Sequence, residues 1–84
     1  MVVRREQRIP RYKPVKVLGL DEPYVAASVD YSEYGLGIVT TLSLRPGDSL
    51  KVSCPDFWPK VRDGVVVWVE PVTDSSSRAG LSLH

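Results

Sequence analysis

The chain is poor in the residues from which catalytic and metal sites are usually built. Its 84 residues include one cysteine, Cys54, and one histidine, His84, which is the last residue. A single cysteine forms no internal disulfide and lacks the paired spacing of a zinc site, so we expect a reducing compartment, the cytoplasm. An imidazole at a chain terminus is poorly held against a nucleophile. These shortages predict a protein that is not an enzyme and holds no metal or resident cofactor.

Long apolar runs are also missing. The longest, Val65 to Val69, is far below the roughly 20 residues that cross a bilayer, so we expect no membrane segment. Seven prolines and six glycines interrupt the short apolar stretches, which disfavours long helices. With 43% hydrophobic and 25% charged residues the composition is typical of a folded chain, and the length allows one domain, 1–84.

Apolar and polar residues alternate through six short segments, which is the pattern of half-buried strands. Clusters of Gly, Pro, Asp and Ser separate the segments and supply tight turns. Connections this short join antiparallel neighbours, and six strands around one small core close most economically into a barrel, because closure removes exposed edges. We therefore predict an all-β fold, a small six-stranded antiparallel β-barrel over 13–84. Its strands are expected around residues 15–17, 25–29, 36–38, 50–52, 61–69 and 79–83.

The same alternation predicts which side chains face the core. In the segment 25–29 the two valines and Ala27 are expected to point inward, so that Ser28 and Asp30 point outward and Ser32 joins them as the chain turns. In the segment 61–69 the residues Val65, Val67 and Val69 are expected on one side. Val66 and Trp68 then lie on the other side, with Trp68 directed away from the core.

Charge is distributed unevenly along the chain. The first 16 residues hold six basic side chains and one acidic one, whereas the other 68 hold five basic and nine acidic. Residues 1–12, the basic arm, are expected to be flexible and to favour an anionic partner. Arg4 and Arg8 in the arm form an R-x-x-x-R spacing, and a guanidinium donates paired hydrogen bonds to phosphate or guanine. A solvated tail gives the same spacing.

A second polar motif, D-x-S-x-x-G, joins two of the expected strands through Asp30, Ser32 and Gly35. An aspartate accepts hydrogen bonds from the N1 and N2 positions of guanine, a serine hydroxyl donates or accepts, and a glycine lets backbone approach a ligand closely. Taken alone, the segment favours an Asx-type turn that Ser32 caps and Gly35 closes.

Together, the basic arm with R-x-x-x-R and the later D-x-S-x-x-G resemble the PilZ domain family, and the resemblance covers nearly the whole chain. It implies a split barrel of six strands that binds cyclic di-GMP, a bacterial second messenger with two guanines and two phosphodiesters. It also implies a regulatory switch in the bacterial cytoplasm that a downstream effector domain or protein reads.

The resemblance further assigns site residues by position. Arg4 and Arg8 would hold phosphates and guanines, Asp30 and Ser32 would bind a guanine, and Gly35 would supply close backbone. Trp68 is either a stacking platform for a guanine or a side chain that packs under the arm or a partner. At the position before the first arginine, a valine favours one bound ligand over a stacked pair. The auxiliary contacts are therefore Val3, Arg5 and Trp68.

Two other functions remain open at this stage. The first is an adaptor that keeps the PilZ-like fold and binds proteins without nucleotide. The second is a barrel that binds RNA or single-stranded DNA through the arm and its aromatic residues. The acidic body of the chain speaks against the second, because a long polyanion needs a basic track.

Overall fold

The computed structural model describes residues 9–10, 12–19 and 24–84 as a sheet of seven strands. Within these residues there is no helix, and therefore none long and apolar enough to span a membrane. In chain order the strands are β1 (Ile9–Pro10), β2 (Pro14–Leu18), β3 (Tyr24–Ser32), β4 (Gly35–Thr40), β5 (Ser49–Ser53), β6 (Arg62–Pro71) and β7 (Ser77–Leu83).

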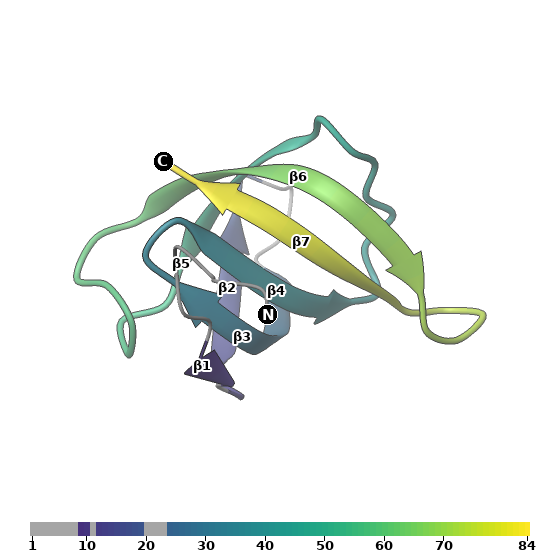
Figure 1. Cartoon of the computed structure of the whole chain (residues 1–84), viewed down its shortest axis with the longest axis horizontal. Coiled ribbons are helices and arrows are strands. Elements are labelled where there is room, and N and C mark those ends of the chain that lie inside the picture. The colour runs from purple at the N-terminus through teal and green to yellow at the C-terminus, as the bar shows by residue number, and fades with distance from the viewer. Residues whose placement is uncertain (1–8, 11, 20–23) are drawn as a thin grey trace, which may run out of the picture.

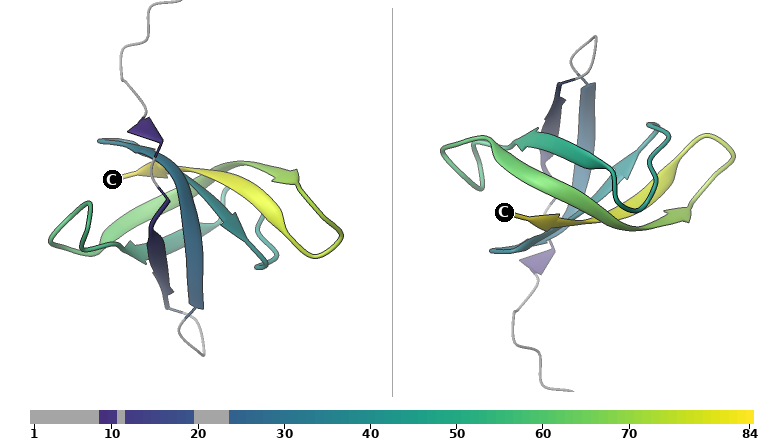
Figure 2. Two further views of the ribbon diagram at one scale, coloured as in Figure 1. Left: turned by 90° about the horizontal axis from the view of Figure 1, so that it is seen from below. Right: turned by 90° about the horizontal axis from the view of Figure 1, so that it is seen from above.

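The strands close into a barrel, as the sequence predicts. The sheet order is β1-β3-β2-β5-β6-β7-β4, every pairing is antiparallel, and an additional β3–β4 pairing joins the two sides. Strands β2 to β7 form the six-stranded ring, and β2 and β3 run steeply across the direction of β6 and β7 (Figures 1 and 2). The short β1 is added outside this ring, beside the end of β3.

The core fills the ring with aliphatic side chains from all six strands. Cys54 lies among them, fully buried, and burial raises the pKa of its thiol, so it is an inert filler. Alternation along β2, β5 and β7 is regular, which is why one face of each strand supplies the core. The buried apolar residues are Val15, Val17, Ala26, Leu36, Ile38, Val52, Cys54, Trp58, Val66, Ala79, Leu81 and Leu83.

The predicted facing of β3 is wrong for Val25, Ser28 and Val29. Val29 lies in the bulge, and its Cγ2 would stand 3.1 Å from an outward Cβ on Gly37. Val25 is 56% exposed, whereas Ala26 and Ser28 are buried. A buried serine is tolerated here because its backbone N–H donates to the Lys13 carbonyl and its hydroxyl accepts from the Lys13 N–H, both at 2.8 Å. The partner that makes Ser28 an inward residue thus comes from the segment before β2, which the local pattern of β3 does not reveal.

The predicted facing of β6 is partly wrong for a different reason. Val66 is buried and Val67 is 56% exposed, but Trp68 is exposed and Val69 again packs on the core. The pairing of β6 with β7 shifts register between Val66 and Trp68, so Val67 is an extra residue in a β-bulge. Trp68 is directed outward as predicted, and Val67 does not share a side with Val69.

An aromatic cluster of Tyr31, Phe57 and Trp58 packs against the core. The rings of Tyr31 and Phe57 stack at 4.1 Å between centroids, and Trp58 meets both edge-on. The Arg62 guanidinium lies 5.5 Å from the Trp58 ring centre and donates to the Glu33 carbonyl at 2.9 Å. The cluster therefore fixes the turn between β3 and β4, which carries the D-x-S-x-x-G motif.

Candidate functional site

One row of paired residues crosses five strands. Pro10 of β1 pairs with Asp30 of β3, Asp30 with Gly37 of β4, Gly37 with Gly80 of β7, and Gly80 with Trp68 of β6. We call these five residues the glycine row. Neighbouring strands lie about 4.8 Å apart, so Asp30 and Trp68 stand roughly 14 Å apart along the row. Two glycines separate a carboxylate from an indole.

The glycine row lies on the outer face of the barrel. Leu36 and Ile38 are fully buried, so a side chain on Gly37 between them would point outward. A Cβ on Gly37 would stand 2.8 Å from Asp30 Oδ1, and one on Gly80 would overlap the Trp68 ring at Nε1. On this outer face the Asp30 side chain therefore lies over Gly37 and the Trp68 side chain over Gly80. The two side chains occupy the space that the glycines leave.

Two β-bulges direct the side chains of Asp30 and Trp68 toward the outer face. The β3–β4 register shifts between Ser28 and Asp30, and the β6–β7 register shifts between Val66 and Trp68. Each bulge follows a buried residue and reverses the alternation, so the residue two positions on points outward instead of inward. Bulges of this kind are common beside binding sites because they re-aim one side chain without breaking the sheet.

Ser32 and Gly35 form the next row on the same face. They pair with each other at the end of the β3–β4 hairpin, and Gly35 also pairs with Ser82. Ser32 is buried. The hairpin is held to β7 because the Tyr34 carbonyl accepts from the Leu83 N–H at 2.9 Å. The structure thus brings Asp30, Ser32 and Gly35 together.

The predicted arm residues Val3, Arg4, Arg5 and Arg8 lie outside the described residues. The arm enters the described part of the structure at β1, where Ile9 pairs with Tyr31 and Pro10 with Asp30. The chain that follows the R-x-x-x-R spacing is therefore hydrogen-bonded to the strand that carries the D-x-S-x-x-G motif.

Arg78 of β7 also belongs to this face, and sequence reasoning missed it. Its Nη2 lies 3.7 Å from Asp30 Oδ2. A signal was available, because Arg78 is two residues before Gly80 and so shares its face in a regular strand. The link to Asp30 needs the strand order, which places β7 one strand beyond β4.

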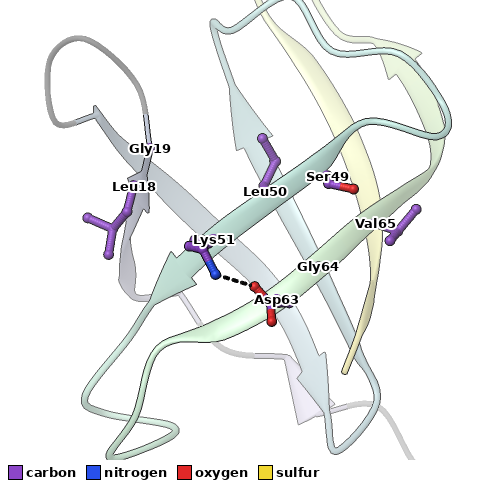
Figure 3. Close-up of a pocket in the computed structure, with 8 residues that line it drawn as sticks. All are labelled: Leu18, Gly19, Ser49, Leu50, Lys51, Asp63, Gly64 and Val65. Carbon is purple, nitrogen blue, oxygen red and sulfur yellow. Dashed lines mark hydrogen bonds and ion pairs between the residues drawn. The ribbon is translucent and has the colours of Figure 1, made fainter.

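A pocket of about 380 Å³ lies away from these residues, where β5 and β6 meet the end of β2 (Figure 3). Lys51 and Asp63 point toward each other at its edge, and their hydrogen bond of 2.8 Å lowers the pKa of the Asp63 carboxyl. Among the described residues no cluster of His, Cys, Asp or Glu could hold a metal. The pocket is lined by Leu18, Gly19, Ser49, Leu50, Lys51, Asp63, Gly64 and Val65.

Comparison with known proteins decides the family. The family model of the PilZ domain matches residues 3–84. The chain belongs to the PilZ family. PilZ domains are regulatory receptor domains and not enzymes, and the family binds cyclic di-GMP and acts on effector proteins.

A solved structure supports the PilZ fold. The Bacillus subtilis inhibitor of motility, MotI/DgrA, matches with a TM-score of 0.73 and 18% sequence identity. The match covers 99% of this chain and 43% of that one, so the chain spans less than half the length of that protein. No curated protein matches the sequence significantly.

Proposed function

We propose that this PilZ domain is a cyclic di-GMP sensor of the bacterial cytoplasm. The ligand is held between the basic arm, through Arg4 and Arg8, and the outer face of β3 and β4, through Asp30, Ser32 and Gly35. Val3, Arg5 and Trp68 complete the site as auxiliary contacts. Binding changes the surface that a downstream effector domain or protein recognises.

The glycine row carries this proposal. Its two glycines leave room for the Asp30 carboxylate and the Trp68 indole to lie along the outer face of β4 and β7. The R-x-x-x-R spacing directly precedes this row in the sequence, because Ile9 follows Arg8 and the next residue, Pro10, pairs with Asp30. A carboxylate and an aromatic ring therefore share one row of the barrel, and the R-x-x-x-R spacing directly precedes the strand that begins this row.

Each of these groups suits one part of the messenger. The Asp30 carboxylate accepts hydrogen bonds from guanine N1 and N2, and the Trp68 ring stacks on a base, which is typically worth about 1–3 kcal/mol. Arginine binds phosphate bidentately, and such charge-assisted hydrogen bonds contribute roughly 1.5–3 kcal/mol each. Ordering an arm of about eight residues opposes these gains by about 1–2 kcal/mol per residue at most. We therefore expect a Kd near 1 µM, which corresponds to about −8 kcal/mol.

The switch follows from the charge of the arm. Two phosphodiesters bound by Arg4 and Arg8 neutralise part of a strongly basic segment and hold it against β3. The ligand concentration sets the populations of the neutralised and the basic surface. A partner that distinguishes these two surfaces therefore responds to the ligand concentration.

Isothermal titration of the chain with cyclic di-GMP, with GTP as the control ligand, tests the proposal. The chain is compared with Arg8→Ala and with Arg45→Ala, a matched control in the exposed turn before β5. We expect saturable micromolar binding that Arg8→Ala removes and Arg45→Ala leaves unchanged. Absence of binding to the unmodified chain would overturn the sensor and leave an adaptor that binds proteins without nucleotide.

A further inference from the structure

The turn between β3 and β4 is tied to its neighbours through backbone carbonyls. Its two residues, Glu33 and Tyr34, are both exposed. The Tyr34 carbonyl accepts from the Leu83 N–H at 2.9 Å, and the Glu33 carbonyl accepts from Arg62 Nη1 at 2.9 Å. The first donor is a backbone group, which nearly every residue type supplies. The second donor is a side chain, so this half of the turn depends on the residue at position 62.

The Arg62 side chain is itself held in place. Arg62 pairs with Val52, which is fully buried, so both side chains lie on the inner face of the sheet. The guanidinium lies 5.5 Å from the centre of the Trp58 ring, and its Nε is 3.4 Å from the His84 carbonyl. A guanidinium lies over an aromatic ring and donates from its edge at the same time. The donor that reaches Glu33 therefore has a fixed position.

The same turn joins the two ends of the D-x-S-x-x-G motif. Ser32 and Gly35 pair with each other directly beside it. Groups that bind a ligand must be held within about 0.5 Å of their productive positions, and hydrogen bonds from residues behind them supply this precision. A turn that loses one of its donors is less well ordered before the ligand arrives, so binding must then order it.

We propose that Arg62 is a positioning residue of the ligand site, which holds the β3–β4 turn in the conformation that cyclic di-GMP binds and does not contact the ligand itself. The inference rests on the proposed function and extends it to the inner face of the sheet. Asp30 lies over the outward side of Gly37, whereas Arg62 lies on the inner face at the start of β6. Three distant segments meet at its guanidinium: the turn, the loop that carries Trp58, and the end of β7.

Two other roles for Arg62 give different results. If Arg62 only stabilised the fold, its loss would lower the unfolding midpoint and leave the affinity unchanged, because the ligand binds the folded chain. If Arg62 bound a phosphate directly, its loss would reduce the salt dependence of the affinity, since each neutralised phosphate adds to that dependence. Loss of a positioning residue lowers the affinity and leaves the salt dependence unchanged.

The experiment titrates the full chain with cyclic di-GMP at low and high salt, beside Arg62→Met and two control variants. Methionine keeps an apolar stem but has no donor for the Glu33 carbonyl. Lys60→Met removes the same charge from the exposed segment before β6. Tyr24→Phe removes a hydroxyl that bonds to Thr41 at the other end of β3. Every titration is made well below the unfolding midpoint of the variant, so that the folded chain is measured.

We expect Arg62→Met to weaken cyclic di-GMP about 3- to 10-fold, which is the range of a single hydrogen bond. Its salt dependence should equal that of Lys60→Met. Lys60→Met and Tyr24→Phe should bind as tightly as the unmodified chain, although Tyr24→Phe should unfold at a lower temperature. The affinity therefore follows the donor to the turn and neither the net charge nor the stability of the barrel.

Hydrogen exchange in the ligand-free chain reports on the turn directly. The Leu83 N–H donates to the Tyr34 carbonyl of the turn, whereas the Val66 N–H donates to the Asp48 carbonyl at 2.8 Å. Arg62→Met should speed the exchange of the Leu83 N–H about 3- to 10-fold, because a turn with one donor fewer opens more often. The exchange of the Val66 N–H should not change.

Four results would overturn the inference while leaving the sensor intact. They are an unchanged affinity in Arg62→Met, a weaker salt dependence than in Lys60→Met, an equal loss of affinity in Tyr24→Phe, and an unchanged exchange of the Leu83 N–H. If Arg62→Met does not fold, Arg62→Lys takes its place in the same comparisons, because lysine keeps the charge and loses the planar fork. If the unmodified chain does not bind cyclic di-GMP, the proposed function itself fails, and that titration alone distinguishes the two failures.

Discussion

The two tryptophans of this domain occupy contrasting surroundings. Trp58 is 8% exposed, packs edge-on against Tyr31 and Phe57, and has the Arg62 guanidinium over its ring. Trp68 is 37% exposed and lies over Gly80, a residue without a side chain. Large aromatic side chains stabilise a fold in proportion to the apolar area that they remove from water. The first tryptophan therefore serves the fold, whereas the second leaves part of its ring exposed, as the proposed stacking on a ligand requires.

The contrast depends on what lies opposite each ring. Neighbours of Trp58 fill the space around it, so even its Nε1 is buried and has no hydrogen-bond partner among the described residues. Leaving an indole N–H in this state costs free energy, which the packing of the ring must exceed. Under Trp68 the strand supplies a glycine, and the bulge at Val67 turns the ring outward. The outward position of this ring thus depends on a glycine in β7 and on one extra residue in β6.

Removing each ring in turn gives the largest expected effect. Trp58→Ala should lower the free energy of unfolding by about 3–5 kcal/mol, a large part of the 5–15 kcal/mol of a typical domain. Trp68→Ala should lower it by about 1 kcal/mol or less, because much of that ring is already in water. Urea denaturation measures both values, and Trp58→Phe keeps the test readable if the alanine variant does not fold. Equal losses for the two alanine variants would contradict the contrast.

A methyl group at position 80 should displace the exposed Trp68 ring. Gly80→Ala places its Cβ on the Trp68 pyrrole ring, so the indole must swing away from the row. We expect cyclic di-GMP binding to weaken as much as in Trp68→Ala, with a stability loss of only about 1 kcal/mol, because an exposed side chain moves at low cost.

The matched control for Gly80→Ala is Gly64→Ala on β6. A Cβ on Gly64 would meet Leu83 and Leu81 at 3.5–3.6 Å, which is ordinary van der Waals contact. Its affinity for the ligand should not change. In a Trp68→Ala background, Gly80→Ala should add almost nothing, because both changes act through the same ring. An additive loss in the double variant would show that Gly80 acts through something other than Trp68.

How much of this could be read from the sequence depends on whether the signal is local. The six barrel strands and their turns were predictable, because alternation and residues such as Pro46 and Gly47 act within a few positions. Gly47 has a positive φ of 97°, and the Asp48 N–H donates to the Arg45 carbonyl at 3.0 Å, as a Pro-Gly turn requires. The PilZ family was also predictable, since its motifs are short segments of sequence.

The facing of β3 and β6 was not predictable, because it is decided by contacts between distant segments. Val25, Ala26 and Ala27 are all apolar, so their pattern does not fix which side is inward. The Lys13 backbone decides it by pairing with Ser28. The glycine row likewise exists only once the register of four pairings is known, so nothing local in the sequence indicated that Gly37 and Arg78 contact Asp30 or that Gly80 contacts Trp68.

The smallest effect is expected at the exposed Lys51–Asp63 ion pair, which belongs to neither tryptophan region. Both side chains are more than 60% exposed, and exposed pairs contribute little to stability. Because Lys51 lowers the pKa of Asp63, the contribution of this carboxylate is present above its unfolded pKa of about 3.9 and is lost as the pH falls through the lower folded value. Thermal unfolding midpoints of the chain and of Lys51→Met should therefore coincide at the acid end of a series from pH 2 to 7, and separate only slightly at pH 7. A large separation at pH 7 would mean that the pair, and the pocket edge on which it lies, supports the fold far more than its exposure indicates.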